Sequence, residues 1–261
     1  MKIIVAIKQV PERDAQVRID ASAKWIEESD LQYAMNESDA YALEEALQLK
    51  EKNGGEVIVL SAGPERVGTT IREALAKGAD RAIHVDCNDL NQRDALAVAR
   101  LIAEAVKPES PDLVLTGLQS DDLGYGQTGV ILAELLGVPH ASLILHVEKT
   151  DGGLPEERIK VKRELEAGWF QDIELPLPAV LTIQSGGNKL RYATLMGIKK
   201  AKSKEMRVVP AAEIASAIPP VAVLESIALP QKQRSTQIIP GDPKQAAAAL
   251  VEKLKFEARV L

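Results

Sequence analysis

Short, continuously apolar runs alternate with amphipathic stretches over the first half of the chain. Four of these runs are rich in β-branched residues and apolar at nearly every position, which is typical of strands covered on both faces. The predicted strands are 2–7, 56–61, 81–85 and 112–116. A further apolar strand is predicted at 179–184. Strands of this kind indicate a parallel sheet, because parallel sheets carry helices on both sides.

The stretches between these runs place apolar residues three or four positions apart and therefore predict helices. The predicted helices cover 38–52, 64–78 and 92–107, and a fourth follows residue 129. Asn36 and Asp39 form a capping pattern for the first helix, and Gly78 closes the second. Since strands and helices alternate, right-handed crossovers give an α/β fold with a doubly wound, mainly parallel sheet and helices on both faces.

After Gly137 the pattern changes to runs that favour antiparallel strands. The predicted strands are 142–148, 158–165 and 170–175. The sequence T-D-G-G at 150–153 predicts a hairpin turn between the first two. These strands either extend the parallel sheet or form a flap beside it.

From residue 204 onward, prolines interrupt the chain at nearly regular intervals. They are Pro210, Pro219, Pro220, Pro230 and Pro240. The apolar pieces between them are too short to form a core, so we expect an extended arm. Asp242 as a cap and Pro243 at the first helical position predict that the arm ends in a helix. Such an arm either packs on a permanent partner subunit or folds back over the first domain.

Composition narrows the possible functions of the chain. It has 261 residues, 46% of them hydrophobic, and 32 basic against 38 acidic residues give a net charge of −6. This charge argues against a nucleic-acid-binding protein. No apolar run approaches the roughly 20 residues that span a bilayer, so we expect a cytoplasmic protein without membrane insertion. One cysteine and three scattered histidines predict neither a metal site nor a redox dithiol.

A glycine-rich segment, T-G-L-Q-S-D-D-L-G-Y-G-Q-T-G at 116–129, follows a predicted strand and precedes a helix. Its glycines let the backbone approach a ligand closely, and Gln127 and Thr128 stand at the positive start of the helix, which favours phosphate. Open α/β sheets bind ligands at this edge. No lysine follows to reach a β- or γ-phosphate, so a nucleoside monophosphate fits better than a triphosphate. The alternative is an ordinary glycine-rich loop.

The chain lacks the motifs of a catalytic site. It contains no nucleophile elbow and no pattern that pairs a histidine with a carboxylate. Asp121 and Asp122 are adjacent in a loop, where capping or hydrogen bonding to a ribose is more common than a metal or acid/base pair. We therefore expect no enzyme activity and no catalytic residue.

The segment 188–204 reads N-K-L-R-Y-A-T-L-M-G-I-K-K-A-K-S-K and combines apolar residues with a basic run. Cations steer an acidic surface into range, and a few buried apolar side chains then supply most of the binding energy. This composition favours a partner-docking loop. The alternatives are a solvated basic face or apolar residues that cover a neighbouring core.

Taken together, five segments resemble the small (beta) subunit of an electron transfer flavoprotein. They are V-A-I-K-Q-V at 5–10, G-A-D-R-A-I-H-V at 78–85, G-L-Q-S-D-D-L-G-Y-G-Q-T-G at 117–129, V-K-R-E-L-E-A-G at 161–168 and N-K-L-R-Y-A-T-L-M-G-I-K-K-A-K at 188–202. The resemblance implies an adenine-nucleotide-binding form of the α/β fold. It also implies an electron carrier whose larger alpha subunit holds most of the redox FAD. Such a heterodimer accepts electrons from flavin-dependent dehydrogenases and passes them to a downstream acceptor.

The resemblance further implies a structural AMP in this chain, a recognition loop for the dehydrogenase and a tuning residue. The positions matched to AMP contacts are Ala6, Asn36, Glu37, Ser38, Asp39, Ala62, Gly117, Leu118, Gln119, Ser120, Asp121, Asp122, Leu123, Gly124, Tyr125, Gly126, Gln127 and Thr128. The positions matched to the recognition loop are Arg191, Tyr192, Ala193, Thr194, Leu195, Met196, Gly197, Ile198, Lys199 and Lys200, with Leu195 as the apolar anchor. Glu164 matches a glutamate that tunes how the mobile flavin domain is positioned for electron transfer.

This interpretation divides the chain into three parts. Residues 1–187 form the AMP-binding domain, 188–204 the partner recognition loop, and 205–261 an arm and helix that pack on the alpha subunit. Two alternatives remain open. One is a bifurcating flavoprotein subunit with a second FAD in the AMP site. The other is a stand-alone nucleotide-binding domain of the universal-stress type.

Overall fold

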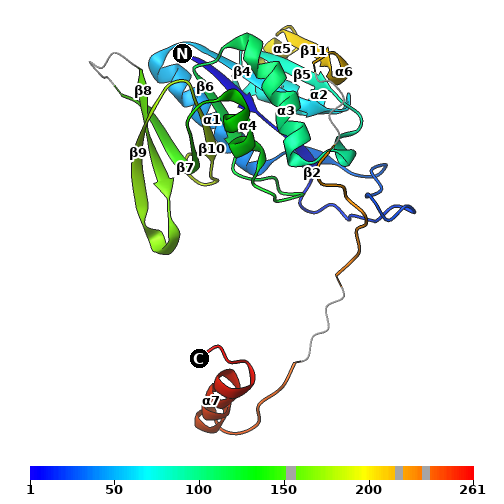
Figure 1. Cartoon of the computed structure of the whole chain (residues 1–261), viewed down its shortest axis with the longest axis vertical. Helices are drawn as coiled ribbons and strands as arrows, with labels where there is room; N and C mark the ends of the chain where they lie inside the picture. Colours follow the sequence, from blue (N-terminus) through cyan, green and yellow to red (C-terminus); the bar gives the residue numbers. More distant parts are fainter. Residues whose placement is uncertain (151–156, 215–219, 231–235) are drawn as a thin grey trace. The chain divides into compact units, whose positions relative to one another are not determined.

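The computed structural model describes residues 1–150, 157–214, 220–230 and 236–261 of the chain (Figure 1). These residues fall into two compact units, Met1–Ile227 and Ala228–Leu261. The first unit contains the sheet and its helices. Among the described residues, no helix combines the length and the apolar character that crossing a bilayer requires.

A sheet of nine strands runs through the first unit in the order β11-β5-β4-β1-β6-β10-β7-β8-β9 (Figure 1). The strands are β1 (Lys2–Ala6), β4 (Glu56–Gly63), β5 (Arg81–Asp86), β6 (Leu113–Gly117), β7 (His140–Lys149), β8 (Arg158–Glu164), β9 (Phe170–Pro176), β10 (Ala179–Ile183) and β11 (Met206–Pro210). The six pairings from β11 to β7 are parallel, whereas β8 and β9 extend the sheet as antiparallel strands. The predicted α/β fold with a mainly parallel sheet is therefore confirmed, and the antiparallel strands extend the sheet.

Helices cover both faces of this sheet because alternate residues of a strand point to opposite sides. The helices of this unit are α1 (Glu37–Asn53), α2 (Val67–Lys77), α3 (Ala95–Val106), α4 (Thr128–Leu136), α5 (Leu195–Ala201) and α6 (Ala211–Ile214). Of these, α5 packs mainly on α2 and not on the sheet. Ile3 of β1 packs in a core with Leu43 of α1 and Ile71 of α2. Its neighbour Ile4 packs in a second core with Leu132 of α4. The two cores explain why the parallel strands are apolar at successive positions.

Three details of the predicted helix starts differ from the observed ones. The second helix begins at Val67 instead of Pro64, because residues 64–66 form a turn before it. The third helix begins at Ala95 instead of residue 92, because the Asp94 side chain accepts a hydrogen bond from the Ala97 amide at 2.8 Å. Asn36 does precede α1, but its side chain makes no capping hydrogen bond. Its amide is used elsewhere, in the site described below. The hairpin turn predicted at 150–153 lies largely outside the described residues.

The segment that follows the predicted recognition loop belongs to the first unit. β11 pairs in parallel with β5, and Ala211 at the start of α6 is buried in the second core. Arg207 also donates to Glu109 at 3.0 Å. Residues 206–214 therefore cover the edge of the sheet. The predicted boundary at 205 had placed them in an extended arm, which the structure does not support. An edge strand of five residues with partly exposed side chains carries little periodic signal.

The second unit, Ala228–Leu261, contains the predicted terminal helix. α7 (Pro243–Glu252) starts with Asp242 and Gln245 in a capping box and has Pro243 in its first turn, as the sequence indicates. A short π-helical turn follows at Lys253–Glu257. Large apolar side chains on this unit are exposed, among them Val251 and Phe256.

Candidate functional site

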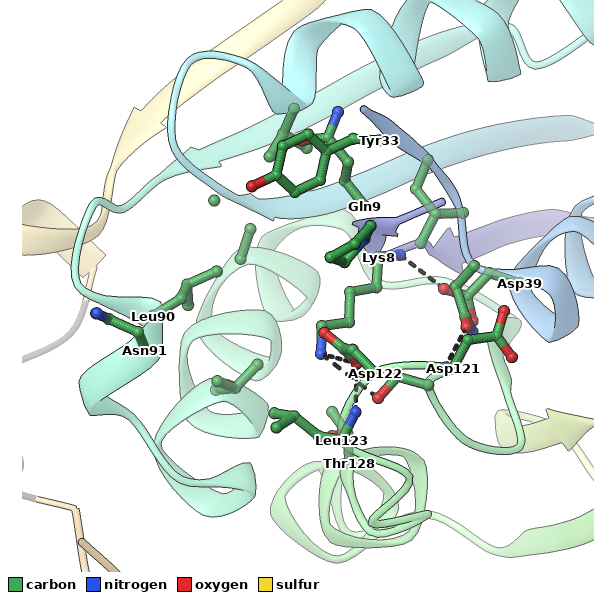
Figure 2. A pocket seen from close by; sticks show the side chains of 18 of the residues that line it. Lys8, Gln9, Tyr33, Asp39, Leu90, Asn91, Asp121, Asp122, Leu123 and Thr128 are labelled. Carbon is green, nitrogen blue, oxygen red and sulfur yellow. Dashed lines mark hydrogen bonds and ion pairs between the residues drawn. The ribbon is translucent and has the colours of Figure 1, made fainter. Parts of the chain in front are cut away.

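A cavity of about 1360 Å³ opens where the parallel strands end (Figure 2). Ala6, Ala62 and Gly117, which stand at or near the carboxyl ends of β1, β4 and β6, line it. This is the edge at which open α/β sheets bind ligands. All the residues matched to AMP contacts line the cavity except Glu37, Ser38 and Gly124.

The start of α1 holds the glycine-rich loop in place. The side-chain amide of Asn36 donates to the Gln119 carbonyl at 3.0 Å, and the Ser38 hydroxyl donates to the same carbonyl at 2.8 Å. Asp39 accepts hydrogen bonds from the Lys8 amide at 2.6 Å and the Gly117 amide at 2.9 Å. These side chains are buried and satisfied within the protein, so they support the loop that forms one wall of the cavity.

Asp39 carries the most perturbed carboxyl group of the site. Burial raises the pKa of Asp39 to about 7, against the hydrogen bonds from Lys8, Asn36 and Gly117 that favour the carboxylate. The side chain is only 5% exposed. The Asp39 carboxyl group, which connects the end of the first strand to the loop, therefore ionises close to neutral pH.

At two positions of the loop, the packing of the protein itself requires glycine. A Cβ atom on Gly117 would collide with the side chains of Asp39 and Ser38, and one on Gly129 would lie 2.5 Å from Thr182 Cγ2. Gly124 and Gly126 instead have φ angles of 65° and 62°, in the left-handed region that favours glycine. The close approach that we attributed to a ligand is thus made, at Gly117 and Gly129, by the protein itself.

Lys8 was missed by the sequence analysis and reaches across the cavity to Asp122. Its Nζ lies 2.7 Å from Asp122 Oδ1 (Figure 2). Burial opposes the ionisation of Asp122, but Lys8 and the hydrogen bonds from Ser120 and Leu123 together lower the pKa of that carboxyl group. Asp121 instead accepts a hydrogen bond from the Glu37 amide at 3.1 Å, at the start of α1. The two aspartates therefore have separate internal partners, and Asp121 takes the capping role expected for a loop aspartate.

Three residues that line the cavity each carry a buried polar atom without a hydrogen-bond partner among the described residues. These atoms are Gln9 Oε1, the Tyr33 hydroxyl and Arg66 Nε. The Arg66 guanidinium lies 4.3 Å from the centre of the Tyr33 ring. Buried polar atoms without partners are unfavourable unless a ligand or water satisfies them. An aromatic ring, a guanidinium and the start of the nine-residue helix α4 form a set that fits a base and a phosphate.

The last residues of the first unit border the same cavity. Leu224 and Ile227 line it. The amides of Val221 and Ala222 donate to Asp94 Oδ2 at 2.8 and 2.9 Å, and the Ile227 amide donates to the Ala23 carbonyl at 2.8 Å. We call residues 220–227 the strap. Its short apolar run at Val221–Leu224 has no periodicity that would predict from the sequence which surface it lies on.

The predicted recognition loop contains a helix, α5, whose apolar side chains face outward. Tyr192 is 91% exposed and Leu195 is 82% exposed, and Met196 and Ile198 are also exposed. Thr194 caps the helix by accepting a hydrogen bond from the Gly197 amide at 3.0 Å. These exposures argue against the alternative that the segment covers a neighbouring core.

Glu164 ends β8 and is half-buried, and its carboxylate accepts a hydrogen bond from Gln184 at 3.3 Å. The turn that follows presents exposed Leu165, Trp169 and Phe170 at the tip of the β8–β9 hairpin. Lys162 lies 4.2 Å above the Phe170 ring. No sequence motif predicted a role for these aromatic residues, although two adjacent aromatics in a polar hairpin were a usable signal.

The fold and the cavity define an α/β protein with the architecture of nucleotide-binding domains. Residues 24–214 match the family model described as the electron transfer flavoprotein domain. The chain is 39% identical to the electron transfer flavoprotein subunit beta of Methylophilus methylotrophus, with 97% of each chain covered. It is 34% identical to the subunit of the same name from Bos taurus and 31% identical to that of Bacillus subtilis, over its whole length. This chain belongs to the electron transfer flavoprotein family, on its beta-subunit branch, and its place is therefore in electron transfer.

Proposed function

We propose that this chain is the subunit of a heterodimeric electron transfer flavoprotein that holds a structural nucleotide and docks the electron donor. The alpha subunit would hold most of the FAD, which accepts electrons from flavin-dependent dehydrogenases and passes them to a downstream acceptor. In this proposal the chain itself is an electron-carrier subunit without catalytic residues. Its cavity, α5 and the unit Ala228–Leu261 then have separate tasks.

The exposed apolar helix α5 is the observation that carries the docking role. Leu195 is 82% exposed, on a helix that packs on the protein through Gly197 and Ala201. Large apolar side chains at this exposure bind well when a partner pocket removes them from water. A single anchor with few surrounding contacts also suits a carrier that must bind and release its donors quickly.

AMP is the nucleotide that we assign to the cavity. The residues that would hold it are the Gln127–Thr128 start of α4 for the phosphate, and Arg66 with Tyr33 for the aromatic base. Bound there, AMP would join the glycine-rich loop to β1 and β4 and undergo no reaction. The cavity volume of about 1360 Å³ exceeds the roughly 300–1,000 Å³ typical of small-ligand pockets, which favours keeping a second FAD as the alternative occupant.

Nucleotide analysis of the purified heterodimer tests this proposal. The chain is co-expressed with its alpha subunit, the complex is denatured, and the released nucleotides are separated and quantified. We expect one FAD and one AMP per heterodimer. Two FAD molecules would establish the bifurcating alternative, and a monomer without flavin would favour the stand-alone nucleotide-binding domain.

The partner surface on this chain includes the second unit. Its exposed apolar residues, such as Val251 and Phe256, would pack on the alpha subunit, because a short helix with an exposed apolar face is poorly stable alone. The cytoplasmic location remains a prediction, since a relative from Oryza sativa that is 36% identical is named as mitochondrial. Fractionation of the source cells with an antibody to this chain tests it.

A further inference from the structure

The cations around α5 are not equivalent. Lys199, Lys200 and Lys202 are exposed, as a steering surface requires. Arg191 and Lys204, at the two ends of the same run, instead turn back onto α1 and α2. The basic run therefore contains two kinds of cation, although in the sequence they look alike.

Arg191 is held between two glutamates of α1. Its Nε donates to Glu44 Oε2 at 2.8 Å and its Nη2 to Glu44 Oε1 at 3.0 Å. Its Nη1 donates to Glu51 Oε1 at 2.5 Å, and its backbone amide donates to Glu44 Oε2 at 3.2 Å. Burial opposes the ionisation of Glu44, but Arg191 and Gln48 lower the pKa of this carboxyl group overall. Forked guanidinium–carboxylate pairs of this kind fix position as well as charge.

A second set of contacts holds the other end of α5. Arg72 of α2 donates through Nη1 to the Ala201 carbonyl at 2.6 Å and to the Lys204 carbonyl at 2.9 Å. Lys204 in turn donates through Nζ to the carbonyls of Leu75 and Ala79 at the end of α2. The last carbonyls of a helix have no partner inside it, so each cation stabilises a helix end.

The middle of α5 lies directly on α2. A Cβ atom on Gly197 would collide with the Ala76 carbonyl, and Ala201 is only 3% exposed. A helix of seven residues does not form alone in water, because its nucleation costs more than its few hydrogen bonds return. The order of α5 therefore depends on these contacts with α1 and α2.

We propose that Arg191 and Lys204 clamp α5 in its docking conformation, and that Glu44, Glu51 and Arg72 are positioning residues for the docking of an electron donor. The clamp holds the backbone that carries Leu195 before the partner arrives, so less conformational entropy is lost on binding. Arg191 thereby moves from the predicted docking contacts to the support of the docking helix. The docking part of this inference rests on the proposed function, whereas the clamp itself does not.

Arg191→Lys is the decisive variant, because it keeps the positive charge and loses the fork. Lys199→Gln is the matched control, because it removes an exposed charge of the same run. Amide hydrogen exchange of residues 195–201 is measured on the heterodimer by mass spectrometry. We expect Arg191→Lys to speed this exchange at least ~10-fold and Lys199→Gln to leave it unchanged. Arg72→Met, which acts at the other end, should also speed it. Wild-type exchange in both Arg191→Lys and Arg72→Met would overturn the clamp.

Reduction of the heterodimer's FAD by a purified flavin-dependent dehydrogenase from the same source tests the positioning role. For Arg191→Lys we expect the KM for the flavoprotein to rise about 10-fold with kcat and FAD content unchanged, since the clamp acts on docking and not on the flavin. Lys199→Gln should mainly weaken the salt dependence of KM. Faster exchange with an unchanged KM would overturn the positioning role. If the wild-type complex were not reduced at all, the proposed function would fail, and the exchange result would still decide the clamp.

Discussion

Helix α1 contacts both the cavity and the segment that leads into α5, but the two regions differ in which side chains are buried and which are exposed. At the start of α1, Asn36, Ser38 and Asp39 are buried and bonded to the glycine-rich loop. Further along α1, Glu44 holds Arg191 so that Leu195 stays 82% exposed. At the cavity, buried polar side chains hold the loop that forms a wall. Next to α5, polar side chains are fixed by ion pairs while an apolar side chain remains exposed. Arg191, which resembles a contact residue in the sequence, thus contacts Glu44 within the chain and supports the segment that leads to Leu195.

The largest expected effect comes from filling the space at Gly117. Gly117→Ala places a Cβ atom against Asp39 and Ser38, which must move and lose their hydrogen bonds to the loop. Overpacking and the loss of a buried hydrogen bond together cost about 3 kcal/mol. We expect the purified heterodimer to lose most of its AMP, measured by nucleotide release and chromatography. Gly124→Ala is the control for the loop, since its Cβ atom would meet little, although its positive φ costs about 1 kcal/mol.

The next largest effect is expected at α5. Leu195→Ala removes the apolar anchor, and truncation of such a residue typically costs about 2 kcal/mol of binding, or roughly 30-fold in affinity. We expect KM for the donor dehydrogenase to rise by that factor in a steady-state reduction assay. Val208→Ala is the matched control, because Val208 is 51% exposed on β11 and lies outside α5. An equal rise in both variants would contradict the assignment of Leu195 as the anchor.

A smaller effect is expected where the strap meets the cavity. Asp94→Asn keeps a side-chain oxygen for the cap of α3 and replaces the oxygen that accepts from Val221 and Ala222 by a donor. Weakening these exposed contacts costs about 1 kcal/mol, or fivefold. We expect AMP to leave the heterodimer about fivefold faster, measured by exchange against labelled AMP. Val223→Ala, in the same strap but 72% exposed, should release AMP at the wild-type rate.

The last prediction is a pH dependence centred on Asp39. Its pKa is raised to about 7 in the folded protein, above the ordinary value of 3.8, so the folded state keeps this proton longer than the unfolded state. Its contribution to stability is therefore fully present below pH 3.8, decreases as the pH rises towards 7 and is constant above that. We expect the urea midpoint of the wild-type heterodimer to fall over this range relative to Asp39→Asn. Parallel profiles for the two proteins would show that Asp39 ionises with its ordinary pKa.

The sequence was sufficient where a local pattern repeats and insufficient where distant segments meet. The continuous apolar runs predicted β1, β4 and β6 correctly, because a strand covered on both faces has no alternative composition. Lys8 and Asp122 lie 114 positions apart, and no local pattern pairs them. The helix α5 was predicted as a loop, since seven residues clamped by other helices carry little periodicity. The edge strand β11 was missed for the same reason.

Nucleotide content and dehydrogenase-coupled reduction, measured on the same two heterodimers, Gly117→Ala and Leu195→Ala, show whether the cavity and α5 act separately. We expect a crossed result. Gly117→Ala loses AMP but, for the complex that stays folded, keeps its KM for the dehydrogenase, whereas Leu195→Ala keeps one AMP and one FAD and loses docking. Loss of both properties in each variant, or loss of AMP from Leu195→Ala, would contradict the claim that the cavity and α5 have separate roles.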